Sequence, residues 1–233
     1  MAEQRQDGFT NVFLGHGLKN RDPLANSKYI SAPLLTDNQL ADMYRGNALV
    51  RRIIDLPAEE AVKNWITVEG DEEESRAIQM LDDLGAEEAF ANALRWSRLF
   101  GGSAILMTIS DGGAFEDELQ ENKIDAVEAI TVYDRREVII NNAIFNDDPR
   151  SPAYGRPEWY EICQSAGGIM FYAHRSRVLI FDGEALPNQE RIARQGWGGP
   201  VMQGLYDAVA HNDDAHRLAR LIMERMSQSV TKF

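Results

Sequence analysis

The sequence HRSRVLIFDG at residues 174–183, followed by GWGGP at residues 196–200, decides the expected fold. Its β-branched and aromatic run at 177–181 is typical of a strand, and the glycines indicate sharp turns. Pro200 is an acceptable first helical residue, so a helix is expected after it. The stretch therefore predicts strand, turn, glycine-rich elbow and helix. It contains no recognisable set of catalytic side chains, which favours a structural role over an enzyme.

The bulk composition is that of an acidic globular protein. The 233 residues carry a formal net charge of −13, with 44% apolar and 26% charged residues. An acidic chain repels phosphate, which disfavours tight nucleic-acid binding but not weak, sliding contact with a duplex. No run approaches the roughly 18 apolar residues of a membrane helix, and we expect no secretory signal. Because Cys163 is the only cysteine, no internal disulfide can form, which indicates a reducing cytoplasm.

Periodicity and turn signals predict an α+β protein, with helices and a mixed or antiparallel sheet, in three parts. Residues 1–35, rich in Gly, Asn, Asp and Pro, are expected to form a flexible N-terminal arm. Residues 36–199 are expected to form an α/β domain with a mobile, acidic insertion at 110–126. Residues 200–233 are expected to form one long helix, or two helices that meet at Asn212.

The expected elements of the middle part follow from caps and apolar spacing. Helices are predicted from Thr36 to about Arg45, from Asn47 with a kink or restart at Pro57, over Glu72–Leu84 and over Ala86–Phe100. Strands are predicted at 65–68, 103–109, 127–133, 136–145, 158–164, 168–173 and 177–181, with the clearest hairpin around Gly167 and Gly168.

In the C-terminal helix, the apolar residues form two groups. Met202, Leu205 and Val209 lie on one face, and the second group is expected to continue a similar face: Leu218, Leu221, Ile222 and Met226. The polar residues 211–216 separate the two groups.

The histidines and the cysteine give no clear site. His211 and His216 are five residues apart, which places their rings on different sides of a helix and disfavours a shared metal ion, even beside Asp213 and Asp214. Cys163, in a predicted strand, is expected to be a small core residue.

The glycine-rich elbow at 196–200 precedes a helix but lacks the Lys-Ser/Thr ending of a phosphate loop. Trp197 is instead expected to pack onto a neighbouring surface. We therefore expect no catalytic residue, no cofactor and no metal.

The charged residues come in runs and pairs. The acidic runs 71–74 and 116–118 are typical of solvated faces. The paired arginines suit salt bridges between subunits, which high salt would loosen: Arg51/Arg52, Arg135/Arg136 and Arg175/Arg177.

Five segments, in their order and spacing, resemble portal proteins of tailed bacteriophages, the head–tail connectors of the branch formerly catalogued as a domain of unknown function. They are YRGNALVRRIIDLPA at 44–58, KNW at 63–65, ALRWSRLFGGSAILM at 93–107, HRSRVLIFDGEALP at 174–187 and GWG at 196–198. The resemblance spans about residues 36–233.

This resemblance implies a ring of identical subunits, typically twelve, at one capsid vertex, through which phage DNA is packaged and ejected. It implies as partners a terminase large subunit, tail or adaptor proteins, capsid or scaffold protein, and double-stranded DNA in weak sliding contact, with no membrane. The protein would reside in the virion, and in the host cytoplasm during assembly. Residues 36–199 would be the wing domain and 200–233 a stem candidate, without an active site.

Other interpretations remain open at this point. The chain is an adaptor or docking protein in one of them, and a phage-encoded enzyme or defence-counteracting factor in a less favoured one, since portal-like sequences can sit beside catalytic domains. Portals of this family are usually about twice as long. We therefore expect the N-terminal half of a portal: a fragment, a degenerate prophage copy or a short relative.

Overall fold

The computed structural model describes residues 34–66, 72–140, 150, 157–164 and 168–229. The chain divides into two units, Met1–Leu34 and Leu35–Phe233, and all the elements below belong to the second. Of the arm expected over residues 1–35, residues 1–33 lie outside the described part.

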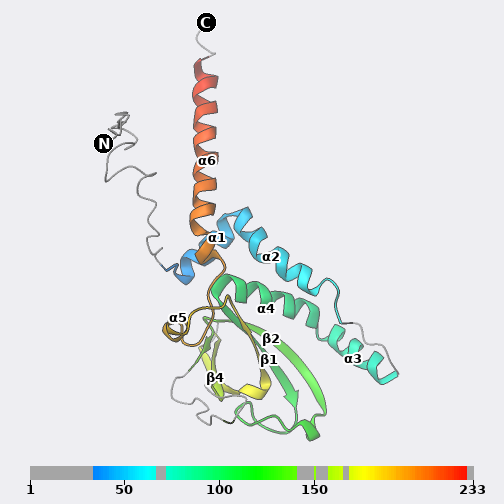
Figure 1. Cartoon of the computed structure of the whole chain (residues 1–233). Helices are drawn as coiled ribbons and strands as arrows, with labels where there is room; N and C mark the ends of the chain where they lie inside the picture. Colours follow the sequence, from blue (N-terminus) through cyan, green and yellow to red (C-terminus); the bar gives the residue numbers. More distant parts are fainter. Residues whose placement is uncertain (1–33, 67–71, 141–149, 151–156, 165–167, 230–233) are drawn as a thin grey trace, which may run out of the picture. The chain divides into compact units, whose positions relative to one another are not determined.

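Six α-helices and two three-stranded antiparallel sheets make up the described part, which confirms the α+β class (Figure 1). The helices are α1 (Asp37–Gly46), α2 (Ala48–Val62), α3 (Glu72–Asp83), α4 (Ala86–Phe100), α5 (Asn188–Ala193) and α6 (Met202–Ser229). The strands are β1 (Gly102–Ser110), β2 (Ala126–Asp134), β3 (Val138–Ile139), β4 (Trp159–Gln164), β5 (Ile169–His174) and β6 (Val178–Asp182).

The first two helices begin at the capping residues that the sequence predicts. The Thr36 hydroxyl accepts a hydrogen bond from the Gln39 N–H, and the Gln39 side chain accepts one from the Thr36 N–H, which completes a capping box. Asn47 Oδ1 accepts hydrogen bonds from the N–H groups of Leu49 and Val50. Of the predicted kink or restart at Pro57, the restart does not occur: α2 runs through Pro57 as one helix, with buried residues on both sides of it, Val50, Ile54, Ala58 and Val62.

The two sheets enclose the main core, and α4 covers the outer face of the first. In the order β2-β1-β6, strand β1 is central and alternates its side chains between two layers. Ala104 and Leu106 join a core cluster with residues of the second sheet, β3-β4-β5, whereas Ile105 packs against Ala89 and Ala93 of α4. The hairpin β4–β5 has the predicted position, with Gln164 opposite Ile169.

The glycine-rich elbow buries Trp197 between these layers. Its side chain is 1% exposed and belongs to the cluster that contains Ala173 and Val178, which confirms the expected packing. A Cβ atom at Gly102 would lie 2.2 Å from the Trp197 ring, and one at Gly183 would lie 2.4 Å from the Gly199 carbonyl oxygen. These positions therefore require glycine for close approach, not for backbone angles.

Two predicted strands differ in the structure, and one short helix is additional. In the strand predicted at 65–68, Trp65 and Ile66 lie in no strand, and residues 67–68 lie outside the described part. The Trp65 ring instead packs edge to face on the Phe90 ring, with their centroids 5.4 Å apart. The strand predicted at 136–145 is found at Val138–Ile139, and residues from 141 are outside the described part. The six-residue α5 was not predicted, because so short a helix shows no apolar period.

The segment 110–126, expected to be a mobile insertion, is bonded to the turn between β5 and β6. Arg177 Nη2 donates to Asp111 Oδ2 at 2.6 Å, and both side chains are almost fully buried. Arg177 Nε donates to the Asp117 carbonyl oxygen, and the Ser176 hydroxyl accepts from the Leu119 N–H. The mobility of the segment stays a prediction, but these contacts argue against it.

The paired arginines form contacts within the chain rather than supplying free charges for other subunits. Arg135 pairs with Asp37, Arg136 with Asp134, and Arg177 with Asp111. A more distant pair joins Arg52 and Glu59 at 3.8 Å, and the Arg51 guanidinium lies over the Tyr44 ring. Inter-subunit salt bridges stay a prediction, but Arg135 and Arg177 are already paired with carboxylates distant in sequence.

Replacing Trp197 by alanine should cost about 3 kcal/mol of unfolding free energy, because it removes a large side chain from a closed core. Urea unfolding followed by circular dichroism measures this. Ile192→Ala, at a side chain that is 69% exposed, is the control and should change stability by less than about 0.5 kcal/mol. Equal losses for the two variants would contradict the core assignment.

Gly183→Ala should destabilise the chain strongly, whereas Gly46→Ala should not. The added methyl at Gly183 meets two backbone segments, while nothing lies within 4 Å of one at Gly46. Alanine also favours a helix over glycine by up to about 1 kcal/mol, so Gly46→Ala is expected to be neutral or stabilising. Thermal melting compares the two, and a Gly183→Ala variant that melts like the wild type would show that the elbow can open.

The Asp111–Arg177 pair should make the unfolding free energy depend on pH, through the Asp111 carboxylate. Its hydrogen bond to Arg177, together with those from the Gln120 and Gly113 N–H groups, lowers the pKa of Asp111 from 3.8 to about 2. A depressed pKa contributes stability above the unfolded value, and that contribution is lost as pH falls from about 3.8 towards 2. In urea titrations, the stability gap between wild type and Asp111→Asn should therefore shrink over that window. Asp214→Asn, at an exposed pair, should show no such change; a constant gap for Asp111→Asn would refute the prediction.

Candidate interaction surface

The first two turns of α6 are packed into the helical part of the domain. Met202 and Val209 are buried in a cluster with Leu40, Val50 and Ile54 of α1 and α2. The Leu35 N–H donates to Gln203 Oε1 at 2.9 Å. These contacts connect the N-terminal part of α6 firmly to the domain.

The later turns of α6 have no such support. Every residue from His211 to Ser227 is exposed, and in Figure 1 these turns run clear of the other helices and of both sheets. Asn47 Nδ2 donates to Asp213 Oδ2 at 2.7 Å and so links the first exposed turn of α6 to the start of α2. More than half of this 28-residue helix therefore meets solvent on all sides.

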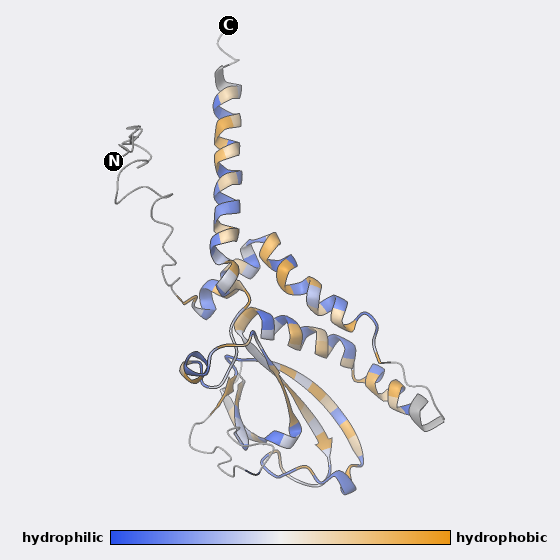
Figure 2. Cartoon of the chain, in the orientation of Figure 1, coloured by the Kyte–Doolittle hydropathy of each residue, from blue (hydrophilic) through white to orange (hydrophobic). Residues whose placement is uncertain are grey.

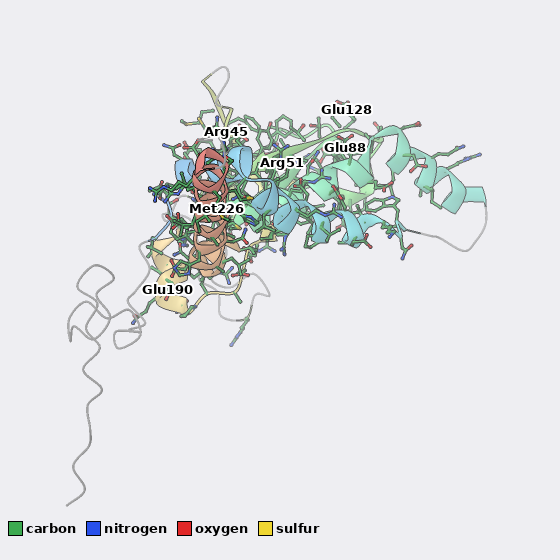
Figure 3. The ribbon with its side chains drawn as sticks, turned by 90° about the horizontal axis from the view of Figure 1, so that it is seen from above. Arg45, Arg51, Glu88, Glu128, Glu190 and Met226 are labelled. Atoms are coloured by element: carbon green, nitrogen blue, oxygen red, sulfur yellow. The ribbon has the colours of Figure 1, made fainter. Side chains whose placement is uncertain are left out.

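Five large apolar side chains stand on these turns. Four of them form what we call the α6 stripe: Leu218, Leu221, Ile222 and Met226; the fifth, Met223, lies outside it. The four side chains of the stripe are 57%, 46%, 59% and 66% exposed. Figure 2 shows this part of α6 as alternating apolar and polar bands, and Figure 3 labels Met226 on it. Exposed apolar side chains gathered on one element mark a surface for another molecule.

The α6 stripe points away from the face that packs on the domain. An α-helix turns by about 100° per residue, so Leu218, nine residues after Val209, lies about 180° around the helix from it. The prediction that the second apolar group continues the first face was therefore wrong. On the packed face, within about 40° of Val209, the residues after Asp213 are of mixed character and all exposed: His216, Arg220, Met223 and Ser227. The domain that holds the base of α6 cannot cover the stripe.

Charged side chains beside the stripe are paired along the helix. Arg217 pairs with Asp214 at 2.9 Å, and Arg220 with Glu224 at 3.1 Å. Such exposed pairs contribute little to stability, but they neutralise one another locally. Arg225 lies within the arc of the stripe and can lay its aliphatic stem along it. The stripe is thus apolar apart from Arg225, and the charges beside it are nearly balanced.

The residues considered for metal binding or catalysis are not brought together. His211 and His216 are exposed on α6, and the described part of the chain holds no group of three His, Cys, Asp or Glu able to bind a metal. His174 Nδ1 accepts from the Ser176 N–H and lies 2.8 Å from its hydroxyl oxygen, while burial lowers the pKa of His174. Cys163 is a half-buried free thiol rather than a fully buried core residue.

The backbone of the glycine-rich elbow is used within the chain. The Gly199 N–H donates to the Glu184 carbonyl oxygen, and the Val201 N–H donates to that of Arg98. The N–H groups of Gly196 and Trp197 donate to carbonyl groups of α5 and the residue after it. A phosphate needs such N–H groups free, so the elbow serves the turn and not an anion.

An open acidic recess lies where α2 and α4 meet the end of α3. Its carboxylates come from Glu59, Asp82, Glu87 and Glu88, and Arg95 joins Asp55 and Glu59 at its side (Figure 3 labels Glu88). It faces solvent and holds no arrangement typical of an acid–base pair.

Among the described helices, none has the length and apolarity required to span a bilayer.

Two curated relatives match nearly the whole chain at low identity. A protein from Caulobacter sp. (strain RHG1) is 28% identical over 224 residues, and one from Sphingomonas paeninsulae is 27% identical over the same length. Both are named anti-CBASS protein Acb1. The match covers 94% of this chain but 35% of each relative, so the chain spans about a third of their length. These names specify no catalytic activity.

A family comparison extends over most of the described structure. The family model described as phage portal protein matches residues 38–233. This range begins within α1 and includes both sheets, the glycine-rich elbow and all of α6. It agrees with the segments that carry the resemblance seen in the sequence, so the chain belongs to the phage portal protein family.

Proposed function

We propose that this chain is a structural portal subunit, or the N-terminal part of one, which assembles with other copies into a ring at the capsid vertex. The observation that carries this proposal is the α6 stripe, which faces away from its own domain in a member of the portal family. The ring would let phage DNA enter during packaging and leave during ejection. α6 would be the stem helix and the sheets with α1–α4 the wing.

Helix energetics supports self-association. Helices in proteins gain most of their stability by packing an apolar face against other elements, and the exposed turns of α6 have no such packing within the described domain. Burying one leucine or isoleucine side chain contributes about 1.5–3 kcal/mol. If each α6 places its stripe against a different surface of its neighbour, the contact is heterologous, and a suitable rotation closes such contacts into a ring.

The proposed partners follow from the portal role. They are a terminase large subunit, tail or adaptor proteins, and capsid or scaffold protein, with residence in the virion after assembly in the host cytoplasm. Contact with double-stranded DNA would be weak, because a net charge of −13 gives little attraction for phosphate. The chain would itself carry no active site, and bond-making steps would belong to its partners.

A second candidate is favoured by the names of the curated relatives. The chain would then be the portal-type part of a larger anti-CBASS protein, since it matches about a third of two proteins with that name. Expressing this chain in cells that carry CBASS and counting phage plaques separates the candidates. Restored plaque formation by this chain supports the second, and unchanged counts with a purified ring support the first.

Leu218→Glu combined with Ile222→Glu should abolish association of the purified chain. Each glutamate replaces a side chain that the assembly would bury, so at least about 1.5 kcal/mol per position and subunit is lost. Mass photometry and negative-stain electron microscopy should show rings for the wild type and single subunits for this variant.

Met223→Glu is the matched control, because it adds the same charge to the same exposed helix. It lies about 140° around the helix from Leu218, outside the stripe, and should leave most association intact. Circular dichroism should show that all variants fold. A wild-type chain that stays a single subunit at high concentration, or a stripe variant that still forms rings, would refute the proposal.

A further inference from the structure

Asn47 makes two kinds of hydrogen bond with one side chain. Its Oδ1 atom accepts from the N–H groups of Leu49 and Val50, at 2.9 and 3.3 Å, and so caps the start of α2. Its Nδ2 atom donates to Asp213 Oδ2 on α6 at 2.7 Å. The oxygen of the Asn47 amide thus caps α2, while its nitrogen binds Asp213 of α6, which is 166 residues later in the sequence.

Asp213 lies in the first exposed turn of α6, directly after the buried part of the helix. It lies four residues after Val209 and eleven after Met202, within about 40° of both around the helix. It therefore continues their buried face. Beyond it the same face carries Arg220, Met223 and Ser227, which are exposed.

Because the part of α6 after Asp213 is long, a small tilt at Asp213 displaces its far end by several ångströms. Sixteen residues separate Asp213 from Ser229, which corresponds to about 24 Å of helix. A tilt of about 10° at Asp213 would move the far end by about 4 Å, enough to take an apolar side chain out of van der Waals contact. A contact at the base therefore decides where the stripe is presented.

We propose that the Asn47–Asp213 hydrogen bond is a positioning clamp that fixes the direction in which α6 leaves α2. The buried residues Met202 and Val209 hold the base of α6 in place, and the clamp restrains its tilt. The effect of the clamp on assembly rests on the proposed function, but the tilt itself does not.

The chain offers a nearly isosteric way to break only the clamp. Asn47→Asp retains an acceptor for the α2 cap, since aspartate caps helices as well as asparagine. It replaces the donor by a carboxylate oxygen that repels Asp213. Adding Asp213→Asn restores the donor with its direction reversed, so the double variant should recover the clamp. Asp213→Ala removes the acceptor without touching the cap.

The tilt can be measured directly with spin labels. In a Cys163→Ser background, Glu88→Cys on α4 and Glu224→Cys on α6 provide two exposed labelling sites. Pulsed electron resonance gives their distance distribution. Mixing labelled with about tenfold unlabelled chain removes distances between subunits. Melting temperature and far-ultraviolet circular dichroism check the cap and the fold.

The expected result is a narrow distribution for the wild type and one that shifts or broadens by several ångströms for Asn47→Asp and Asp213→Ala. The double variant should return to the wild-type distribution, which a merely structural loss would not do. Unchanged distances in both single variants, or no recovery in the double variant, would overturn the clamp. If the clamp behaves as expected but the wild type forms no ring, the proposed function fails and this inference stands.

Discussion

Three segments of backbone meet in van der Waals contact around the glycine-rich elbow, and the arrangement of the layers depends on that contact. The Gly183 N–H donates to the Gly101 carbonyl oxygen, and Glu184 and Gly199 exchange two backbone hydrogen bonds. A Cβ atom at Gly183 would lie 2.6 Å from the Gly101 Cα atom. Because no side chain fits between them, the end of α4, the end of β6 and the approach to α6 are held together. The Trp197 ring lies against Gly102, beside this contact, and belongs to the core between the sheets.

Elements with local signals could be predicted from the sequence. Thr36 and Asn47 mark the starts of α1 and α2, and the Gly101-Gly102 pair marks the passage from α4 to β1. Features that depend on distant residues could not. Nothing near Trp65 shows that its ring would pack on Phe90 instead of joining a strand, and nothing near Arg177 indicates Asp111, 66 residues earlier, as its partner.

The candidate surface was only half visible in the sequence. The sequence shows the apolar residues of the α6 stripe, and the helical period alone places Leu218 opposite Val209. The hydrogen bond between Asn47 and Asp213 could not be predicted, because Asn47 is already explained as a cap and Asp213 looks like one of many solvated carboxylates. Its detection requires knowing that α6 packs beside the start of α2.

The exposed second half of α6 also has a consequence for the lifetime of an unassembled copy. Helical turns without tertiary support fray readily and expose their backbone to proteases. Arg217, Arg220 and Arg225 all lie in these turns, and each is a cleavage site for trypsin-like enzymes. A solitary subunit is therefore open to trimming, whereas neighbours that cover the helix would shield the same bonds. Resistance to such digestion would record which copies have been incorporated.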